Sequence, residues 1–574
     1  MDKIKSSRML VALCCLLLLT LSVAAQRGIR PKPTTTRERK ALARKLDEFV
    51  TRNAAYGFSG AVLVAERGQV LLHKAYGYAD RAKRIPNTTA TVFPLASIGK
   101  QFTAAAIFKL ESEGKLKVSD SISKYLHHVP QAMAAITIAQ LLTHSAGISR
   151  EADNHVDMGA TRDEFVAAVL RIPLQSRPGE KYSYSNAGYS LLAAIVEEVT
   201  GRTYETYVRN ELLGPANLHR TGWRPEFDSR EFARGYQDAY RTEGSEVTFP
   251  PSGVLDSTVE DLYRWNEALY TDQPLTAAAR NKLFTPAFDE YVNGWYKTRT
   301  KLGDEVILGD GHTPGYDAYI IRFPARRIAM AFLINNDAGW GDPMYEGLRD
   351  ILFGQKYEML PAVTVLGDQQ LAKYSGKYQL PSGATLQVRF ADGTLLIDGL
   401  GQEAVSLLAG SEPSSEVQFA ALNSQTAELI EHLKKGDFDW VKSITKFETP
   451  APLERLRHFW DTMISSKGTL KEFHVVGTTI LRTGQPQTFV RFDLERGTEL
   501  WFLLRRGGKL SGWDINVDAP SATRFLPISP TEFASFEIAT RRITRIRFRI
   551  DEAGRVVALG SGVVENQTEA KRIE

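Results

Sequence analysis

Ser97 and Lys100 stand three residues apart in the stretch Ser97-Ile98-Gly99-Lys100. Residues at positions i and i+3 share one face of a helix, so the lysine amine can reach the serine hydroxyl. A serine hydroxyl attacks a carbonyl carbon poorly until a base takes its proton, and a lysine whose pKa is lowered by burial can be that base. A helix N-terminus at this point favours the alkoxide that forms. The spacing therefore indicates a nucleophilic serine and acyl transfer.

The same spacing occurs twice more, at 121–124 and 443–446. Only Ser97 precedes a long run, 101–110, with good helix formers and apolar residues at helical spacing. Ser121 follows an aspartate in a polar stretch, which indicates a helix cap, and Ser443 has no partner motif near it. The context therefore selects Ser97.

Tyr184-Ser185-Asn186 supplies side chains that could assist a nucleophilic serine. A buried tyrosine beside a lysine can share proton transfer with the serine and pass the proton to the leaving group. An asparagine amide can hold both a substrate carbonyl and the lysine. The pattern also occurs at 291–293, so by itself it leaves open that Tyr184 is only a half-buried loop aromatic.

Taken in order, these motifs and the stretch 311–315 resemble those of the serine β-lactamase and penicillin-binding protein superfamily. The nearest branch contains class C β-lactamases, D-alanyl-D-alanine carboxypeptidases, D-aminopeptidases and family VIII esterases. Three further segments, 136–148, 178–180 and 257–262, are similar to stretches typical of that branch. The resemblance covers residues 38 to 355.

The resemblance implies a role for each matching residue. Ser97 would be the acylated nucleophile, Lys100 and Tyr184 would share the base role, and Asn186 would position substrate and lysine. The backbone N–H of Ser97 and one from the strand after His312 would form the oxyanion hole. The buried-type histidine His144 would be structural.

The third motif departs from the family pattern of Lys-Thr-Gly or His-x-Gly. One interpretation is a shortened turn in which His312 takes the cationic place and Gly315 binds substrate. The other takes Gly309-Asp310-Gly311 as the motif and leaves no cation there. We prefer the first. Either interpretation weakens recognition of a substrate carboxylate, which favours an esterase or aminopeptidase over a carboxypeptidase or β-lactamase and leaves loss of turnover open.

The N-terminus has the pattern of a signal peptide over residues 1–25. A basic start precedes the apolar run 9–25, which ends in small residues suited to cleavage. The alternative is an uncleaved membrane anchor. We expect an exported protein, periplasmic or extracellular, with no membrane span in its mature chain. The only cysteines, Cys14 and Cys15, lie in this segment, so the mature chain would have neither disulfides nor a cysteine nucleophile.

Composition excludes several other classes of function. A net charge of +4 over 574 residues gives no case for nucleic-acid binding. The histidines are scattered without ligand spacing, so no metal site is predicted, and no glycine-rich phosphate loop follows a strand, so no cofactor is expected. The expected partner is a small-molecule or peptide substrate, with cell-wall material as one source. The rival to a hydrolase is a penicillin-recognising sensor without turnover.

Periodicity predicts an α+β fold with several domains. After a linker at 26–37, an antiparallel sheet with a helical cluster spans 38–358 and begins and ends in hairpins. A small all-β domain follows in two pieces, 359–422 and 520–574, and its start, 374–378, resembles lipocalin-like domains. The α+β module between them, 423–519, resembles cystatin- or NTF2-like modules. Its Trp501, Trp513 and Phe502 could line a pocket, but we expect them to pack in its core.

Overall fold

The computed structural model describes residues 35–150, 152, 161–223, 227–236, 255–286, 288, 290–409, 416–446, 451–480, 484–515, 523–538, 540–561 and 569–574. The predicted signal peptide and most of the predicted linker lie outside these residues. Among the helices described, none combines the length and the apolar character that a membrane span needs.

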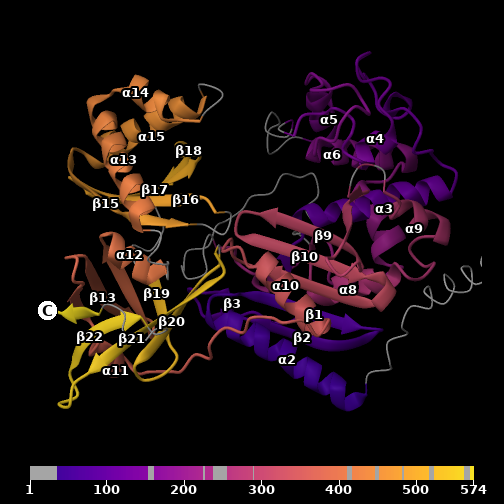
Figure 1. Cartoon of the computed structure of the whole chain (residues 1–574). Coiled ribbons are helices and arrows are strands. Elements are labelled where there is room, and N and C mark those ends of the chain that lie inside the picture. The colour runs from indigo at the N-terminus through magenta and orange to yellow at the C-terminus, as the bar shows by residue number, and fades with distance from the viewer. Residues whose placement is uncertain are drawn as a thin grey trace, which may run out of the picture. The chain divides into compact units, whose positions relative to one another are not determined.

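A seven-stranded antiparallel sheet forms the centre of the first domain (Figure 1). Its order is β2-β1-β11-β10-β9-β8-β7, so the two ends of the domain sequence meet where β1 pairs with β11. This confirms the predicted α+β fold and the two predicted hairpins. The strands are β1 (Gly60–Glu66), β2 (Gln69–Tyr76), β7 (Tyr291–Val292), β8 (Trp295–Arg299), β9 (Glu305–Thr313), β10 (Tyr316–Phe323) and β11 (Ile328–Ile334).

Both faces of this sheet are covered, because its central strands are apolar at nearly every position. On one face Ala61 and Leu63 join the core shared with the helical cluster. On the other face Tyr319 lies against Gly341, at the start of α10 (Gly341–Leu352). The ring of Phe49 from α2 (Thr36–Ala55) lies against Gly347 of α10.

The helical cluster is built around α3 (Gly99–Ser112), whose residues are buried on nearly every side. That burial follows from its run of alanine and phenylalanine, which leaves no polar face. The other helices are α4 (Ile138–Leu142), α5 (Arg162–Leu170), α6 (Asn186–Thr200), α7 (Tyr204–Val208), α8 (Val259–Ala268) and α9 (Ala277–Leu283). Trp265 of α8 stacks on Phe102 of α3 with ring centroids 4.5 Å apart.

The C-terminal all-β domain is a closed eight-stranded barrel in the order β12-β13-β14-β19-β20-β21-β22-β23. Alternate residues such as Leu386 and Val388 are buried inside it, as closure of a barrel requires. Its strands are β12 (Gly376–Gln379), β13 (Thr385–Ala391), β14 (Thr394–Leu400), β19 (Thr523–Pro527), β20 (Glu532–Glu537), β21 (Arg542–Ile550), β22 (Val556–Ser561) and β23 (Ala570–Arg572), with α11 (Asp368–Ala372) just before.

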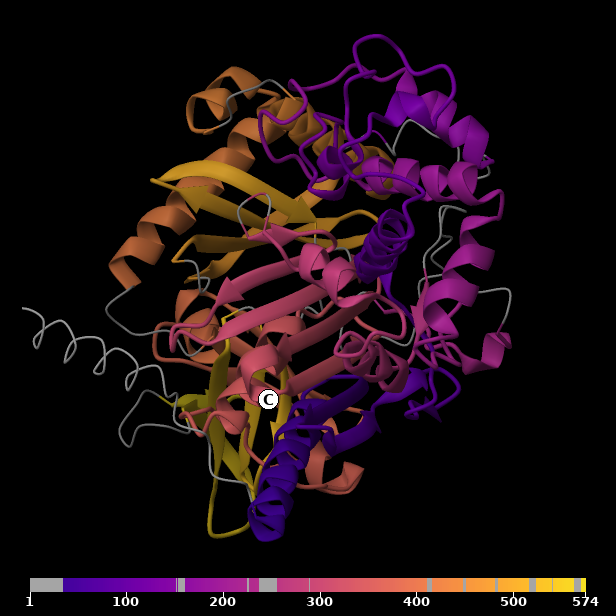
Figure 2. The same cartoon turned by 90° about the vertical axis from the view of Figure 1, so that its right-hand side faces the viewer.

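The inserted module is a four-stranded sheet, β15-β16-β17-β18, with helices on one face (Figures 1 and 2). Trp501 is fully buried in its core, as expected. Helix α13 runs through the predicted boundary at 422/423. The elements are α13 (Glu416–Lys435), α14 (Phe438–Ser443), α15 (Ala451–Lys467), β15 (Leu470–Ile480), β16 (Pro486–Leu494), β17 (Gly497–Arg506) and β18 (Lys509–Ile515). Helix α12 (Gln402–Ala409) precedes them, and its Ala404 and Leu408 belong to the core of the barrel.

Candidate active site

Ser97 lies in a short 3₁₀ turn, η1 (Ala96–Ile98), that leads directly into α3. The preceding residue, Ala96, has φ of 45°, in the left-handed region that a side chain disfavours. Such a conformation costs about 1–3 kcal/mol and is usually retained where it positions a functional group. The turn places the Ser97 hydroxyl at the N-terminal end of a buried helix.

The structure brings four of the predicted residues into one hydrogen-bonded group. Ser97 Oγ lies 2.7 Å from Tyr184 Oη. Lys100 Nζ donates to Ser97 Oγ at 3.2 Å and to Asn186 Oδ1 at 2.8 Å. The lysine ammonium also lies 4.9 Å from the centre of the Tyr184 ring, within the range of a cation–π contact. The serine hydroxyl therefore contacts two titratable groups, and either could take its proton when it is itself deprotonated.

His144 contacts the Tyr184–Asn186 segment through both its ring nitrogen and its ring face. Its Nδ1 accepts a hydrogen bond from the backbone N–H of Ser185 at 3.1 Å, so the ring proton lies on Nε2, 2.9 Å from Tyr291 Oη. Its ring centroid is 4.4 Å from that of Tyr184. Burial, with a smaller effect of the Lys100 charge, lowers the pKa of His144 well below its usual value. A neutral, positioning histidine agrees with the structural role expected for it.

Strand β9 passes close beside the nucleophile. A side chain at Gly311 would collide with the Leu95 carbonyl oxygen, and its Cβ would lie 3.0 Å from the backbone nitrogen of Ser97. Strand β8 pairs with β9 only from residue 305 to 308. Within the described part of the chain, the edge of β9 after Leu308 is therefore not covered by β8. This edge is suited to hold a substrate carbonyl near the Ser97 N–H.

The two interpretations of the third motif differ in which side chains face the helix. Gly309 also points toward α3, where a side chain would collide with the amide of the fully buried Gln101. His312 projects from the other face of β9, has 63% of its side chain exposed, and pairs through Nδ1 with Asp317 Oδ1 at 2.9 Å. The packing favours Gly309-Asp310-Gly311 as the motif beside Ser97, whereas His312 as a substrate contact stays a prediction.

Gly315 serves the turn between β9 and β10. Thr313 pairs with Tyr316, so Pro314 and Gly315 are the two turn residues, and Gly315 has φ of 85°. Proline followed by a glycine with positive φ is the pattern of a type II turn. The Gly315 N–H donates to Asp337 Oδ2 at 2.7 Å. These contacts give Gly315 a structural role, and its predicted contact with substrate stays a prediction.

Two features of this region were missed by the sequence reasoning. Asp310, Asp317 and Asp337 each have a raised pKa, caused mainly by burial, and the nearby Lys100 charge partly offsets the shift at Asp310. The guanidinium of Arg150 lies 5.8 Å from the centre of the Tyr184 ring. The acidic residues come from three segments that only the sheet brings together, so no local pattern could reveal them.

Comparison with known proteins agrees with this geometry. A family model described as Beta-lactamase matches residues 42–352, more than half of the 574-residue chain. The chain therefore belongs to the β-lactamase family of serine hydrolases and penicillin-binding proteins.

Individual relatives have related names. Penicillin-binding protein 4* of Bacillus subtilis is 28% identical over 413 residues, covering 65% of this chain and 89% of that protein. The putative penicillin-binding protein PbpX of the same organism is 32% identical over 251 residues, covering 42% of this chain and 62% of its own length. A penicillin-binding protein from Bacillus halodurans has a similar structure, with 25% sequence identity, coverage of 55% of this chain and 98% of that one, and a TM-score of 0.46.

Proposed function

We propose that the protein is a serine hydrolase that cleaves an amide or ester through an acyl-enzyme on Ser97. The observation that carries the proposal is the hydrogen-bonded group of Ser97, Tyr184, Lys100 and Asn186. Ser97 Oγ would attack the substrate carbonyl while its proton passes to Tyr184 as a phenolate or to Lys100 as a neutral amine. That proton then moves to the leaving group, and water later releases the acyl group by the reverse path.

The side chains around β9 favour a substrate that has no carboxylate in the part that lies beside this strand. No side chain stands at Gly309, and His312 is paired with Asp317. Asp310 adds a carboxyl group whose field reaches Lys100. Strand β9 therefore offers no unpaired cation to hold an anionic substrate group, which a neutral group or an ammonium does not need. We therefore propose neutral or amine-bearing amides and esters as the substrate class, with cell-wall peptides as one source.

Steady-state hydrolysis tests this proposal. We expect the purified protein to hydrolyse neutral nitrophenyl esters or nitroanilides of D- or L-amino acids, and Ser97→Ala to lose that rate. Acylation that stops at one equivalent, with no continuing release, would favour the second candidate instead. That candidate is a penicillin-recognising sensor. It is favoured by the names of the two Bacillus subtilis relatives and by the glycine at position 309, which provides no cationic side chain.

We also propose that residues 1–25 direct export of the protein. The basic, apolar and small-residue regions of this segment are its support. N-terminal sequencing of the protein secreted by its host tests this, with Gln26 expected as the first residue. A mature chain that still begins at Met1 would contradict it.

A further inference from the structure

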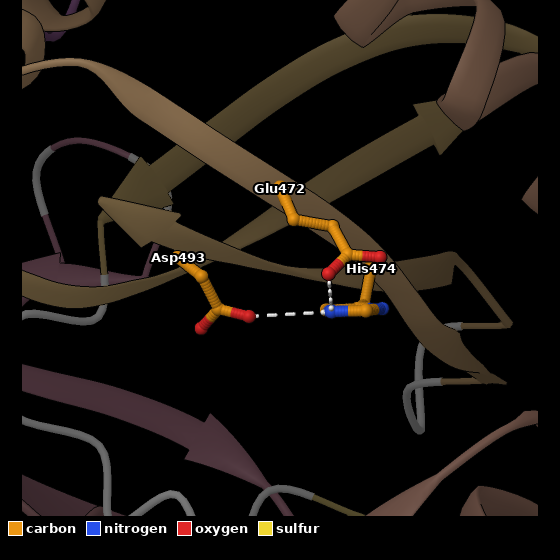
Figure 3. Close-up of side chains that lie close together, drawn as sticks. All are labelled: Glu472, His474 and Asp493. Atoms are coloured by element: carbon orange, nitrogen blue, oxygen red, sulfur yellow. Dashed lines mark ion pairs between the residues drawn. The ribbon is translucent and has the colours of Figure 1, made fainter. Parts of the chain in front are cut away.

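A second cluster of chemically competent side chains lies in the inserted module, on strands β15 and β16 (Figure 3). His474 Nε2 is 3.5 Å from Glu472 Oε2 and 3.2 Å from Asp493 Oδ2. The three potential ligand atoms all lie within 4.8 Å of one another. Among the described residues this is the one group of three such side chains that meets that distance.

The strand register explains how the cluster forms. Glu472 and His474 are two residues apart on β15 and so share a face of the sheet. Asp493 of β16 pairs directly with Glu472. Like charges directly opposite each other in a sheet destabilise it, unless a cation lies between them. The Arg491 guanidinium, 3.2 Å from Asp493 Oδ2, offsets part of this repulsion, and a metal ion among the three side chains would offset more of it.

Strand β15 is irregular on both sides of this segment. Its register with β16 shifts between Leu470 and Glu472 and again between Val475 and Gly477. Such bulges bend a strand and re-aim its side chains, and they occur often beside functional sites. Here the two bulges lie on either side of the segment that contains Glu472 and His474.

The spacing of the ligand atoms suits a small divalent metal ion. Bonds of about 2.0–2.2 Å at tetrahedral angles place the ligands of zinc roughly 3.3–3.6 Å apart. The two separations from His474 Nε2, 3.2 and 3.5 Å, lie within or close to this range. Arg491 Nη2 contacts Asp493 Oδ2 at 3.2 Å, which orients this carboxylate and limits the negative charge of the cluster. One imidazole with two carboxylates, rather than six or more oxygen ligands, favours a transition metal over Ca²⁺.

We propose that Glu472, His474 and Asp493 bind one divalent transition-metal ion, with Zn²⁺ as the expected occupant. The side chains are 68%, 26% and 29% exposed, so the site is open to solvent and leaves a position for water or for a donor from a partner. The proposal does not depend on the hydrolase activity, because none of these residues belongs to the Ser97 group.

Titration of the purified full chain with Co²⁺, after removal of metals by a chelator, tests the site. We expect one equivalent to develop the visible absorption of low-coordinate Co²⁺ and Zn²⁺ to displace it. His474→Ala and Asp493→Asn should abolish that signal. His432→Ala is the matched control, because His432 pairs with Asp437 at 2.9 Å in the same module but, among the residues that the structure describes, belongs to no such group of three. It should leave the signal intact.

If His474→Ala does not fold, Glu472→Gln provides a second test. The Glu472 side chain is the most exposed of the three, so its replacement should disturb the fold least. We expect it to weaken metal binding by at least about tenfold. Added Zn²⁺ should raise the thermal midpoint of the wild-type protein and not that of the variants. Absence of a Co²⁺ spectrum in the wild type, or the same spectrum in His474→Ala, would overturn the proposal.

Discussion

The phenolic oxygen of Tyr184 lies 2.7 Å from Ser97 Oγ, closer than Lys100 Nζ at 3.2 Å. Lys100 is also held by Asn186 Oδ1 at 2.8 Å. In the proposed mechanism, a phenolate at Tyr184 would offer the shorter path for the serine proton, and an ammonium at Lys100 would stabilise that phenolate. This division of labour can be tested one atom at a time.

Removal of the Tyr184 hydroxyl should slow acylation while the fold is kept. For Tyr184→Phe we expect a loss of about 100-fold or more in the acylation rate, because a positioned proton-transfer group contributes about 10²–10⁴-fold. Stopped-flow acylation with an activated ester measures it. Tyr182→Phe is the comparison, since the hydroxyl of Tyr182 is hydrogen-bonded to Tyr296. Equal losses in both variants would argue against a specific role for Tyr184.

Gly311→Ala should abolish or strongly reduce acylation, because its Cβ would displace either β9 or the turn that carries Ser97. The expected loss follows from a shifted oxyanion site, where one missing donor costs about 10²–10³-fold in rate. The comparison is Gly512→Ala, where a Cβ would meet its nearest atom at an ordinary 3.6 Å. An active Gly311→Ala enzyme would mean that β9 does not contribute to the site.

Asp310→Asn should change substrate preference. With one repelling charge removed, we expect the ratio of kcat/KM for a carboxylate-bearing substrate to that for its neutral amide to rise by about tenfold. Arg150→Gln should move the ratio the other way, because it removes a cation beside Tyr184. A surface variant, Asp461→Asn, serves as the control. An unchanged ratio in Asp310→Asn would remove the electrostatic basis of the proposed substrate class.

The buried His144 should make stability fall in mild acid. Burial lowers its pKa in the folded state, so below about pH 6.5 the unfolded chain binds a proton that the folded chain does not. Stability is therefore full above that pH and decreases as the pH falls, by at most about 1.4 kcal/mol per pH unit from this group.

Denaturant unfolding at pH 7 and pH 5 measures this effect. His144→Gln should lose part of the pH dependence, whereas replacement of the exposed His219 should not. A wild-type slope retained in His144→Gln would show that other groups cause it.

Local patterns were enough to predict much of the fold and of the candidate site. The i, i+3 spacing of Ser97 and Lys100 is a property of one helix, and the alternation in 385–390 is a property of one strand, so both could be read from the sequence. Ser121, expected to be a cap, accepts a hydrogen bond from Ser123 N at the start of a 3₁₀ turn.

The rest depends on how distant segments pack. The close approach of Gly309 to Gln101 depends on how β9 packs against α3. The residue spacing within either segment cannot predict this contact. Likewise, Asp493 reaches His474 only because a bulged strand pairs with its neighbour in one particular register. A one-residue slip would turn these side chains to opposite faces.

The most direct test of the account is the intact mass of the protein after exposure to a fluorophosphonate, with Ser97→Ala treated in parallel. The account predicts a single adduct on the wild-type chain, mapped to Ser97 and absent from the variant. No adduct on the wild type, or an equal adduct on Ser97→Ala, would contradict an activated nucleophile at this position.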